Sequence, residues 1–285
     1  MNGPTLVVKL RKTTTPMRTD SRSCPVRYTE GVTMPSIARS RRWPIDHVPR
    51  FDDVALNVTF RCDLACIGCN RACFLKPPII PDMLVEDVQR VLEEIDAAGV
   101  RLRRVRIIGG EQTLHPDYQE IVRIVHDYAH PRRVRIRMFS NMHSRRARDM
   151  IHWTRKTYPD INVIAAKKQQ SMTFAPLTRY GYLDPKDSGI DCPWPCPIMG
   201  GRGQCGYGVD KFGYYLCPMA GAVDTLLGLN ARATTIKQML DPDFLRQQAE
   251  TICAHCGNFI IPDPLPPTWD HNGTPMSKSY HEALP

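Results

Sequence analysis

Residues 54–69 read VALNVTFRCDLACIGC, and this stretch decides the fold and most of the expected chemistry. Its first half is rich in apolar and β-branched residues and predicts a buried β-strand. Its second half places cysteines at Cys62, Cys66 and Cys69, with the spacing C-x3-C-x2-C. Thiolates gathered in one short loop favour zinc or an iron–sulfur cluster over calcium or magnesium. Three ligands leave one position of a four-ligand site open, so a metal held here has room for a substrate.

Strand and helix patterns alternate downstream of this loop. Amphipathic helices are predicted over 84–98, with Asp82 as N-cap and Gly99 as C-terminal stop, then after His115-Pro116 and near 145–157. Strands are predicted over 104–108, 134–139 and 161–166, and a further helix over 241–252. Such βαβ alternation predicts an α/β fold with a parallel sheet.

Two further motifs follow predicted strands. Gly109-Gly110-Glu111 ends the second strand and Ser140-Asn141 ends the third, as the cysteine loop ends the first. Because chemistry in such sheets lies at the carboxyl ends of the strands, we expect all three segments on one rim.

Composition limits the class of protein. With 285 residues, 42% of them hydrophobic, the chain can bury one large or two small cores. No apolar run is long enough to span a bilayer, and the N-terminus lacks a signal-peptide apolar region. We therefore expect a cytoplasmic protein without membrane contact, in which eleven cysteines favour metal binding or catalysis over disulfides.

Residues 1–50 carry most of the positive charge. Ten lysines and arginines stand against three acidic residues there, so this segment accounts for seven of the nine net charges. It shows no helical or strand period and is expected to be a poorly ordered basic arm. It is either a solvated tail or an electrostatic handle for a nucleic acid, an acidic leader peptide or an acidic electron-transfer protein. The lack of aromatic residues interleaved with the basic ones argues against nucleic acid.

Taken together, the motifs resemble the radical S-adenosylmethionine (SAM) superfamily over roughly residues 54–168. The matching residues are the three loop cysteines and Gly109-Gly110-Glu111-Gln112, followed by Thr-Leu-His-Pro. The resemblance implies a partial (β/α) barrel over 51–185. It is expected to have four or five strands rather than six, because no Gly-x-Ile-x-Gly-x-x-Glu segment follows the fourth strand.

The resemblance also implies the cofactors. Cys62, Cys66 and Cys69 would be the catalytic ligands of a [4Fe–4S] cluster, whose fourth iron binds SAM. An electron from a donor such as flavodoxin or ferredoxin would cleave SAM to a 5′-deoxyadenosyl radical that abstracts a substrate hydrogen.

Five residues would seat SAM: Gly109, Gly110, Glu111, Ser140 and Asn141. The glycines would admit its methionine end, and Glu111 or a neighbouring backbone carbonyl would receive its ammonium. The last two stand where many members have a Thr-Asn-Gly turn. The chain departs from the family at Gly68, where an aromatic residue is usual, and at Gln112, where proline is usual. These departures concern the details of SAM binding.

A second set of cysteines lies within 186–260. Cys205 and Cys217 flank a predicted β-hairpin that turns at Gly213, and the pair Cys253 and Cys256 follows the last helix. This arrangement resembles the SPASM and Twitch extensions and implies a second, auxiliary [4Fe–4S] cluster. A zinc ribbon is the alternative, because a hairpin and a C-x2-C pair suit tetrahedral zinc equally well. Cys192 and Cys196 are spare, and the Pro-rich residues 261–285 are expected to form a tail.

Three functions follow as hypotheses. The first is a radical SAM enzyme that oxidises or rearranges a small polar metabolite such as a sugar or cyclitol. The second is a maturase that modifies a ribosomally made peptide. The third, from another class, is a zinc-binding scaffold or nucleic-acid-binding protein, for which Cys73 could supply the fourth zinc ligand.

Arginines alternate along two predicted strands, at Arg104, Arg106, Arg135 and Arg137. They either lie at solvated strand starts or enter the barrel lumen. Arg137 is nearest to the carboxyl end, where it could hold a carboxylate or phosphate bidentately.

Overall fold

The computed structural model describes residues 50–65, 69, 71–165, 206–253 and 255. These residues belong to one compact unit of the chain, Ser40–Pro285. Several predictions fall outside the described residues: the arm before residue 50, the tail over 261–285, Cys66, Gly68, Cys192, Cys196, Cys205 and Cys256.

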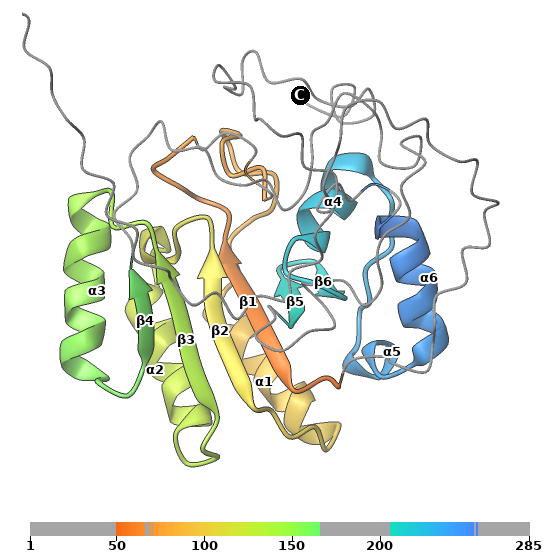
Figure 1. The fold of residues 1–285 in the computed structure, drawn as a ribbon, viewed down its shortest axis with the longest axis horizontal. Helices are drawn as coiled ribbons and strands as arrows, with labels where there is room; N and C mark the ends of the chain where they lie inside the picture. The colour runs from red at the N-terminus through yellow and green to blue at the C-terminus, as the bar shows by residue number, and fades with distance from the viewer. Residues whose placement is uncertain (1–49, 66–68, 70, 166–205, 254, 256–285) are drawn as a thin grey trace, which may run out of the picture. The chain divides into compact units, whose positions relative to one another are not determined.

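One mixed sheet organises the described part of the chain. Its six strands run in the order β4-β3-β2-β1-β5-β6 (Figure 1). All neighbours pair in parallel except β5 and β6, which form an antiparallel hairpin. The bounds are β1 Asp53–Thr59, β2 Arg104–Gly109, β3 Arg135–Ser140, β4 Asn162–Ala165, β5 Tyr207–Asp210 and β6 Gly213–Tyr215. This arrangement confirms the expected α/β fold, consistent with a partial barrel.

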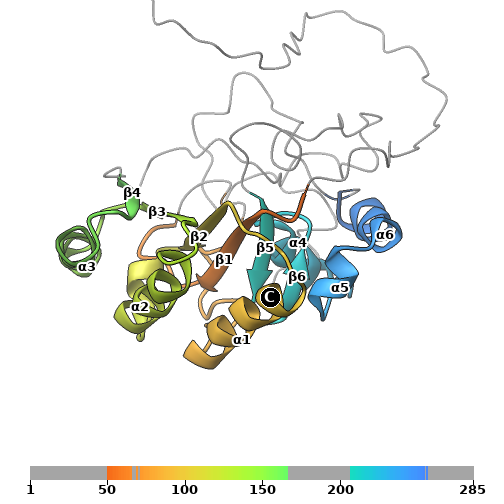
Figure 2. The same cartoon turned by 90° about the horizontal axis from the view of Figure 1, so that it is seen from below.

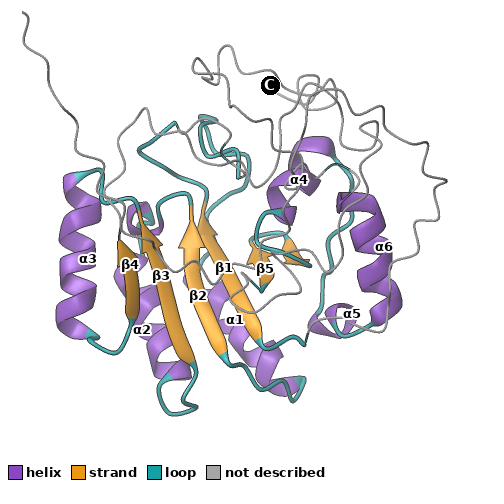
Figure 3. Ribbon diagram, viewed as in Figure 1, coloured by secondary structure: helices purple, strands orange, loops and turns teal. Residues whose placement is uncertain are grey.

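Helices connect the parallel strands of the barrel. Helices α1, α2 and α3 follow β1, β2 and β3 in turn and lie on one side of the sheet (Figure 2). No helix among the described residues is long and apolar enough to cross a membrane. The bounds are α1 Val85–Ala97, α2 Tyr118–Ala129, α3 Arg145–Thr157, α4 Ala220–Leu227, α5 Ile236–Met239 and α6 Pro242–Cys253, with a 3-10 turn, η2, at Gln112–Leu114 (Figure 3).

The core lies between the sheet and these helices. Successive strand residues point to opposite faces of a sheet. Val105 and Ile107 of β2, with Met138 of β3, pack in the same buried cluster as Val91 of α1 and Val125 of α2. The residues that alternate with them, among them the arginines of β2 and β3, therefore face away from α1 and α2.

The start of α1 differs from the prediction. Leu84, not Asp82, is the N-cap, and its backbone N–H donates to the Asp87 carboxylate at 2.7 Å. Asp82 instead accepts from the Thr59 hydroxyl at 2.6 Å and from Arg61 Nε at 2.7 Å. The prediction was wrong because the end of β1 engages the Asp82 side chain. The predicted stop at Gly99 is confirmed, with φ of +68° directly after the helix.

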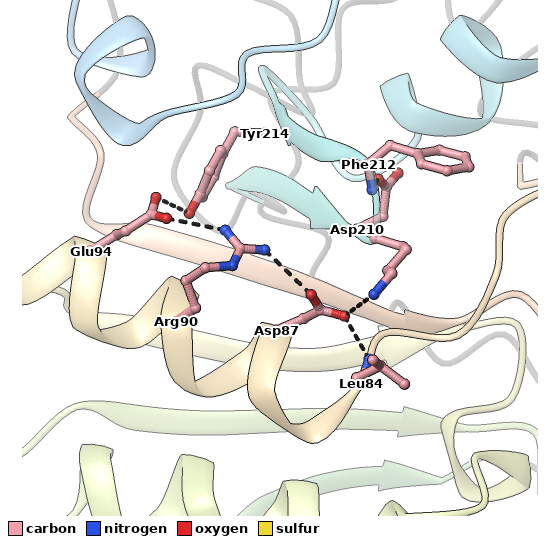
Figure 4. A network of polar contacts seen from close by, with 8 residues as sticks. Leu84, Asp87, Arg90, Glu94, Asp210, Phe212 and Tyr214 are labelled. Atoms are coloured by element: carbon pink, nitrogen blue, oxygen red, sulfur yellow. Dashed lines mark hydrogen bonds and ion pairs between the residues drawn. The ribbon is translucent and has the colours of Figure 1, made fainter.

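The predicted hairpin is present as β5 and β6, but it turns at Lys211-Phe212, and Gly213 is the first residue of β6. The hairpin rests on α1 through a polar network (Figure 4). Lys211 Nζ lies 2.6 Å from the Asp87 carboxylate, and the Tyr214 hydroxyl donates to Glu94 at 2.5 Å. Arg90 links the two acidic residues, at 3.4 Å from Asp87 and 3.0 Å from Glu94. The hairpin is thus held to the barrel both by pairing of β5 with β1 and by this network.

Candidate active site

The three predicted motifs meet at one rim of the sheet. Cys62 follows β1, Gly109-Gly110-Glu111 spans the end of β2, and Asn141 follows β3. The Asn141 side-chain amide lies 3.8 Å from Cys62 Sγ and donates to the Asp63 carboxylate at 2.8 Å. The amide of Asn141 therefore joins the third strand end to the cysteine loop.

The glycines let the end of β2 approach the start of that loop. A Cβ on Gly109 would lie 2.2 Å from the Thr59 carbonyl oxygen. One on Gly110 would lie 2.3 Å from the Arg61 carbonyl oxygen and 3.1 Å from Cys62 Cβ. This close approach allows the N–H of Gly110 to donate to Thr59 at 2.9 Å and that of Glu111 to Arg61 at 2.8 Å. Only glycine fits at Gly110 without displacing the backbone that leads to Cys62.

Glu111 is fully buried and ties β2 to β3. Its carboxylate accepts from the Thr113 hydroxyl at 2.7 Å, from the Ser140 hydroxyl at 3.1 Å and from the Asn141 N–H at 2.7 Å. Burial raises the pKa of Glu111. Both carboxylate oxygens therefore have hydrogen-bond donors within the protein.

The turn after β3 is anchored from the cysteine loop. Asp63 accepts from the Ser144 N–H at 3.1 Å, and Ser144 in turn caps α3 by accepting from the Ala147 N–H at 3.2 Å. Although burial opposes it, hydrogen bonds from Ser144 and Asn141 lower the pKa of Asp63. Met142, the third residue of the Ser-Asn-Met turn, has φ of +55°, a conformation that favours glycine. The chain thus keeps a left-handed turn here without the glycine.

The described sulfurs suit a soft metal centre. A hydrogen bond from Cys73 lowers the pKa of Cys69 to about 6, and the same bond raises the pKa of Cys73. A thiol that ionises near neutral pH is a ready metal ligand. Lys76 Nζ braces the loop by donating to the Cys62 carbonyl at 2.6 Å. These donors fit an iron–sulfur cluster, while the place of Cys73 beside Cys69 also gives the zinc alternative its fourth thiol.

Sequence reasoning missed Asn57. This buried residue of β1 donates from Nδ2 to the Pro218 carbonyl at 3.1 Å and accepts from Arg71 Nε at 3.0 Å. It therefore links the segment after Cys69 to the segment after Cys217. The available signal was a polar residue inside the otherwise apolar run of β1, since a buried amide requires hydrogen-bond partners.

Two of the four proposed auxiliary ligands lie within the described residues. Cys217 follows β6 and Cys253 ends α6. Gln248 of α6 accepts from the Leu216 N–H at 2.7 Å and donates to the Tyr214 carbonyl at 3.2 Å. These bonds fasten the helix that carries Cys253 to the strand that leads to Cys217.

Comparison with known proteins gives one family match. Residues 56–161 match the model of the radical SAM superfamily. A search of curated protein sequences found no match.

Solved structures give only distant likenesses. BtrN in complex with AdoMet and 2-DOIA is 12% identical, with a TM-score of 0.44 over 73% of this chain and 89% of that one. BtrN in an open conformation is 11% identical, with a TM-score of 0.39 over 81% of this chain and 98% of that one. Streptococcus suis SuiB is 15% identical, with a TM-score of 0.27 over 40% of this chain and only 23% of its own length. These likenesses are too distant to bear on function.

Proposed function

We propose that this chain acts as a radical SAM enzyme, that Cys62, Cys66 and Cys69 hold its [4Fe–4S] cluster, and that SAM binds at the same rim. The match of residues 56–161 to the radical SAM superfamily supports this proposal. When bound and reduced by one electron from an external donor, the cluster would cleave SAM and so supply a 5′-deoxyadenosyl radical for hydrogen abstraction. One observation carries the assignment: the Asn141 amide lies 3.8 Å from Cys62 Sγ, which brings the end of β3 to the cysteine loop.

Residues around the loop would act as its support. Gly110 keeps β2 close to the loop, and the buried Glu111 carboxylate fixes the turn that carries Asn141. The Asn141 amide would donate to the Cys62 sulfur, and hydrogen bonds to cluster sulfurs tune the reduction potential. The Lys76 ammonium adds positive charge beside the loop.

The substrate would lie against the sheet face that points away from α1 and α2. That face carries the polar residues Asn57, Arg106 and Arg137, which support a small polar metabolite, and the exposed Phe139 and Ile164, which offer apolar contacts. We propose oxidation or rearrangement of such a metabolite, with modification of a peptide as the alternative. A second cluster held by Cys205, Cys217, Cys253 and Cys256 would supply an electron acceptor or a substrate ligand.

Anaerobic reconstitution with iron and sulfide tests both clusters. We expect about eight irons per chain, which is two [4Fe–4S] clusters. Replacing Cys217 and Cys253 by serine should leave about four irons and SAM cleavage intact. Replacing Cys62 and Cys69 by serine should also leave about four irons, but without SAM cleavage. Tight zinc binding with no SAM cleavage by the wild-type chain would refute the proposal.

A further inference from the structure

Arginines line the sheet face that points away from α1 and α2. Val105, Ile107, Ile136 and Met138 pack in the helical core, so the residues between them point the other way. The parallel register sets Arg104 beside Arg135 and Arg106 beside Arg137. Neighbouring strands lie about 4.8 Å apart, so cationic side chains stand next to one another in two rows.

Asp53 contacts the arginines at the start of β2. Its carboxylate lies 2.7 Å from Arg104 Nε, 3.4 Å from Arg103 and 3.2 Å from Arg106. Arg104 and Arg106 are both buried, with side-chain exposures of 5% and 2%. The Asp53 carboxylate therefore contacts three guanidinium groups, none of which is Arg137.

The next residue in the row is Arg137. It stands between Arg106 and Asn162 in the register of the sheet. It is partly buried, and its Nε is fully buried with no hydrogen-bond partner. No ion pair joins it to any carboxylate of the described residues. A guanidinium stays charged in proteins, and a partly buried charge needs an anion or a hydrogen-bond acceptor.

We propose that Arg137 binds a carboxylate or phosphate group of the substrate. This inference rests on the proposed function and names the substrate class for the same site: a small polar metabolite that carries an anionic group. The planar guanidinium fork matches both anions bidentately, which lysine would not.

The position of Arg137 along β3 supports this role. Ser140, whose neighbour Asn141 contacts the cysteine loop, is the third residue after Arg137 along β3. At about 3.3 Å per residue, Arg137 lies about 10 Å from the rim. An anionic group held at Arg137 would let a molecule of sugar size extend toward the rim, where hydrogen abstraction is proposed to occur.

Inorganic phosphate is a simple probe of this site. Isothermal titration would be run with the reconstituted full chain, at constant ionic strength and with saturating SAM. We expect Arg137→Gln to weaken phosphate binding by about tenfold or more, as expected for loss of a bidentate charged contact. Arg135→Gln is the matched control, because it removes the same charge from the same face of β3 at an exposed position. It should change the affinity by less than about twofold.

Three results would overturn the inference. The first is that Arg137→Gln and Arg135→Gln weaken phosphate binding equally. Phosphate would then respond only to the overall positive charge of this face. The second is that the wild-type chain does not bind phosphate at roughly 50 mM. The binding free energy would then be too small for a specific anion site. The third is an Arg137 effect that is present in a parallel titration without SAM and absent at saturating SAM, which would assign Arg137 to the carboxylate of SAM.

The inference and the proposed function fail in different ways. Formation of 5′-deoxyadenosine by the reduced wild-type chain reports the proposed function alone. SAM cleavage without Arg137-dependent phosphate binding would refute this inference and leave the function. Arg137-dependent binding without SAM cleavage would refute the function, and with it the claim that the bound anion belongs to a radical substrate.

Discussion

Gly110→Ala should separate the two strand ends that form the site. The added Cβ would lie 2.3 Å from the Arg61 carbonyl oxygen and 2.9 Å from its carbon. An ordinary carbon contact is about 3.5 Å, so the backbone must move by about 1 Å. That movement would strain or break the hydrogen bond from the Glu111 N–H to Arg61, now 2.8 Å. Overpacking costs about 1–3 kcal/mol and a lost hydrogen bond about 1 kcal/mol, so we expect a loss of about 2–4 kcal/mol.

Urea unfolding of the full chain would measure this loss, and iron analysis after reconstitution would show whether the loop still holds its cluster. Gly228→Ala is the control, because Gly228 has φ of +61° but no atom within 4 Å of the added Cβ. It should cost only about 1 kcal/mol, from the left-handed backbone. If the unfolding free energy of Gly110→Ala lies within about 0.5 kcal/mol of the wild-type value and the variant keeps its iron, the strand ends are not packed as closely as described.

Three further substitutions test separate parts of the molecule. Burial raises the pKa of Asp210 to about 7, so its contribution to stability is full below the unfolded value, near pH 4, and is lost as the pH rises through about 7. Asp210→Asn should make the unfolding free energy depend less on pH between pH 5 and 8, whereas Asp149→Asn, at an exposed position, is the control and should not. Equal slopes of unfolding free energy against pH for the two variants would contradict this. Asn57→Leu removes one buried and one partly buried hydrogen bond and should lower the unfolding free energy in urea by about 2–4 kcal/mol; a loss under about 1 kcal/mol would show that the link between the two cysteine segments is weak. Cys73→Ser should leave the iron content unchanged, and loss of about four irons would instead make Cys73 a ligand.

Periodicity predicted the elements that bury one apolar face. The expected helix near 145–157 is α3, Arg145–Thr157, because its apolar residues repeat at helical spacing and Ser144 caps it. The strand before the cysteine loop is β1, because its alternate residues are apolar and buried. These features depend on neighbours in the sequence, so the sequence alone is enough to find them.

Long-range partners set the features that sequence reasoning missed. Asn57 bonds to Pro218, 161 residues away, and β5 pairs with β1 across a similar separation. Helix α4 escaped prediction because its sequence, AGAVDTLL, is apolar on nearly all sides and follows a segment rich in glycine and proline. The hydrogen bonds that satisfy Glu111 likewise depend on β2 and β3 ending side by side.

The central claim is that Cys62, Cys66 and Cys69 hold the cluster that cleaves SAM. Its most direct test is the amount of 5′-deoxyadenosine formed when the reconstituted chain is reduced in the presence of SAM. We predict formation by the wild-type chain and by the Cys217→Ser, Cys253→Ser variant, and none by a chain in which the three loop cysteines are serine. A wild-type chain that holds its iron and forms no 5′-deoxyadenosine, or a triple variant that still forms it, would contradict the claim.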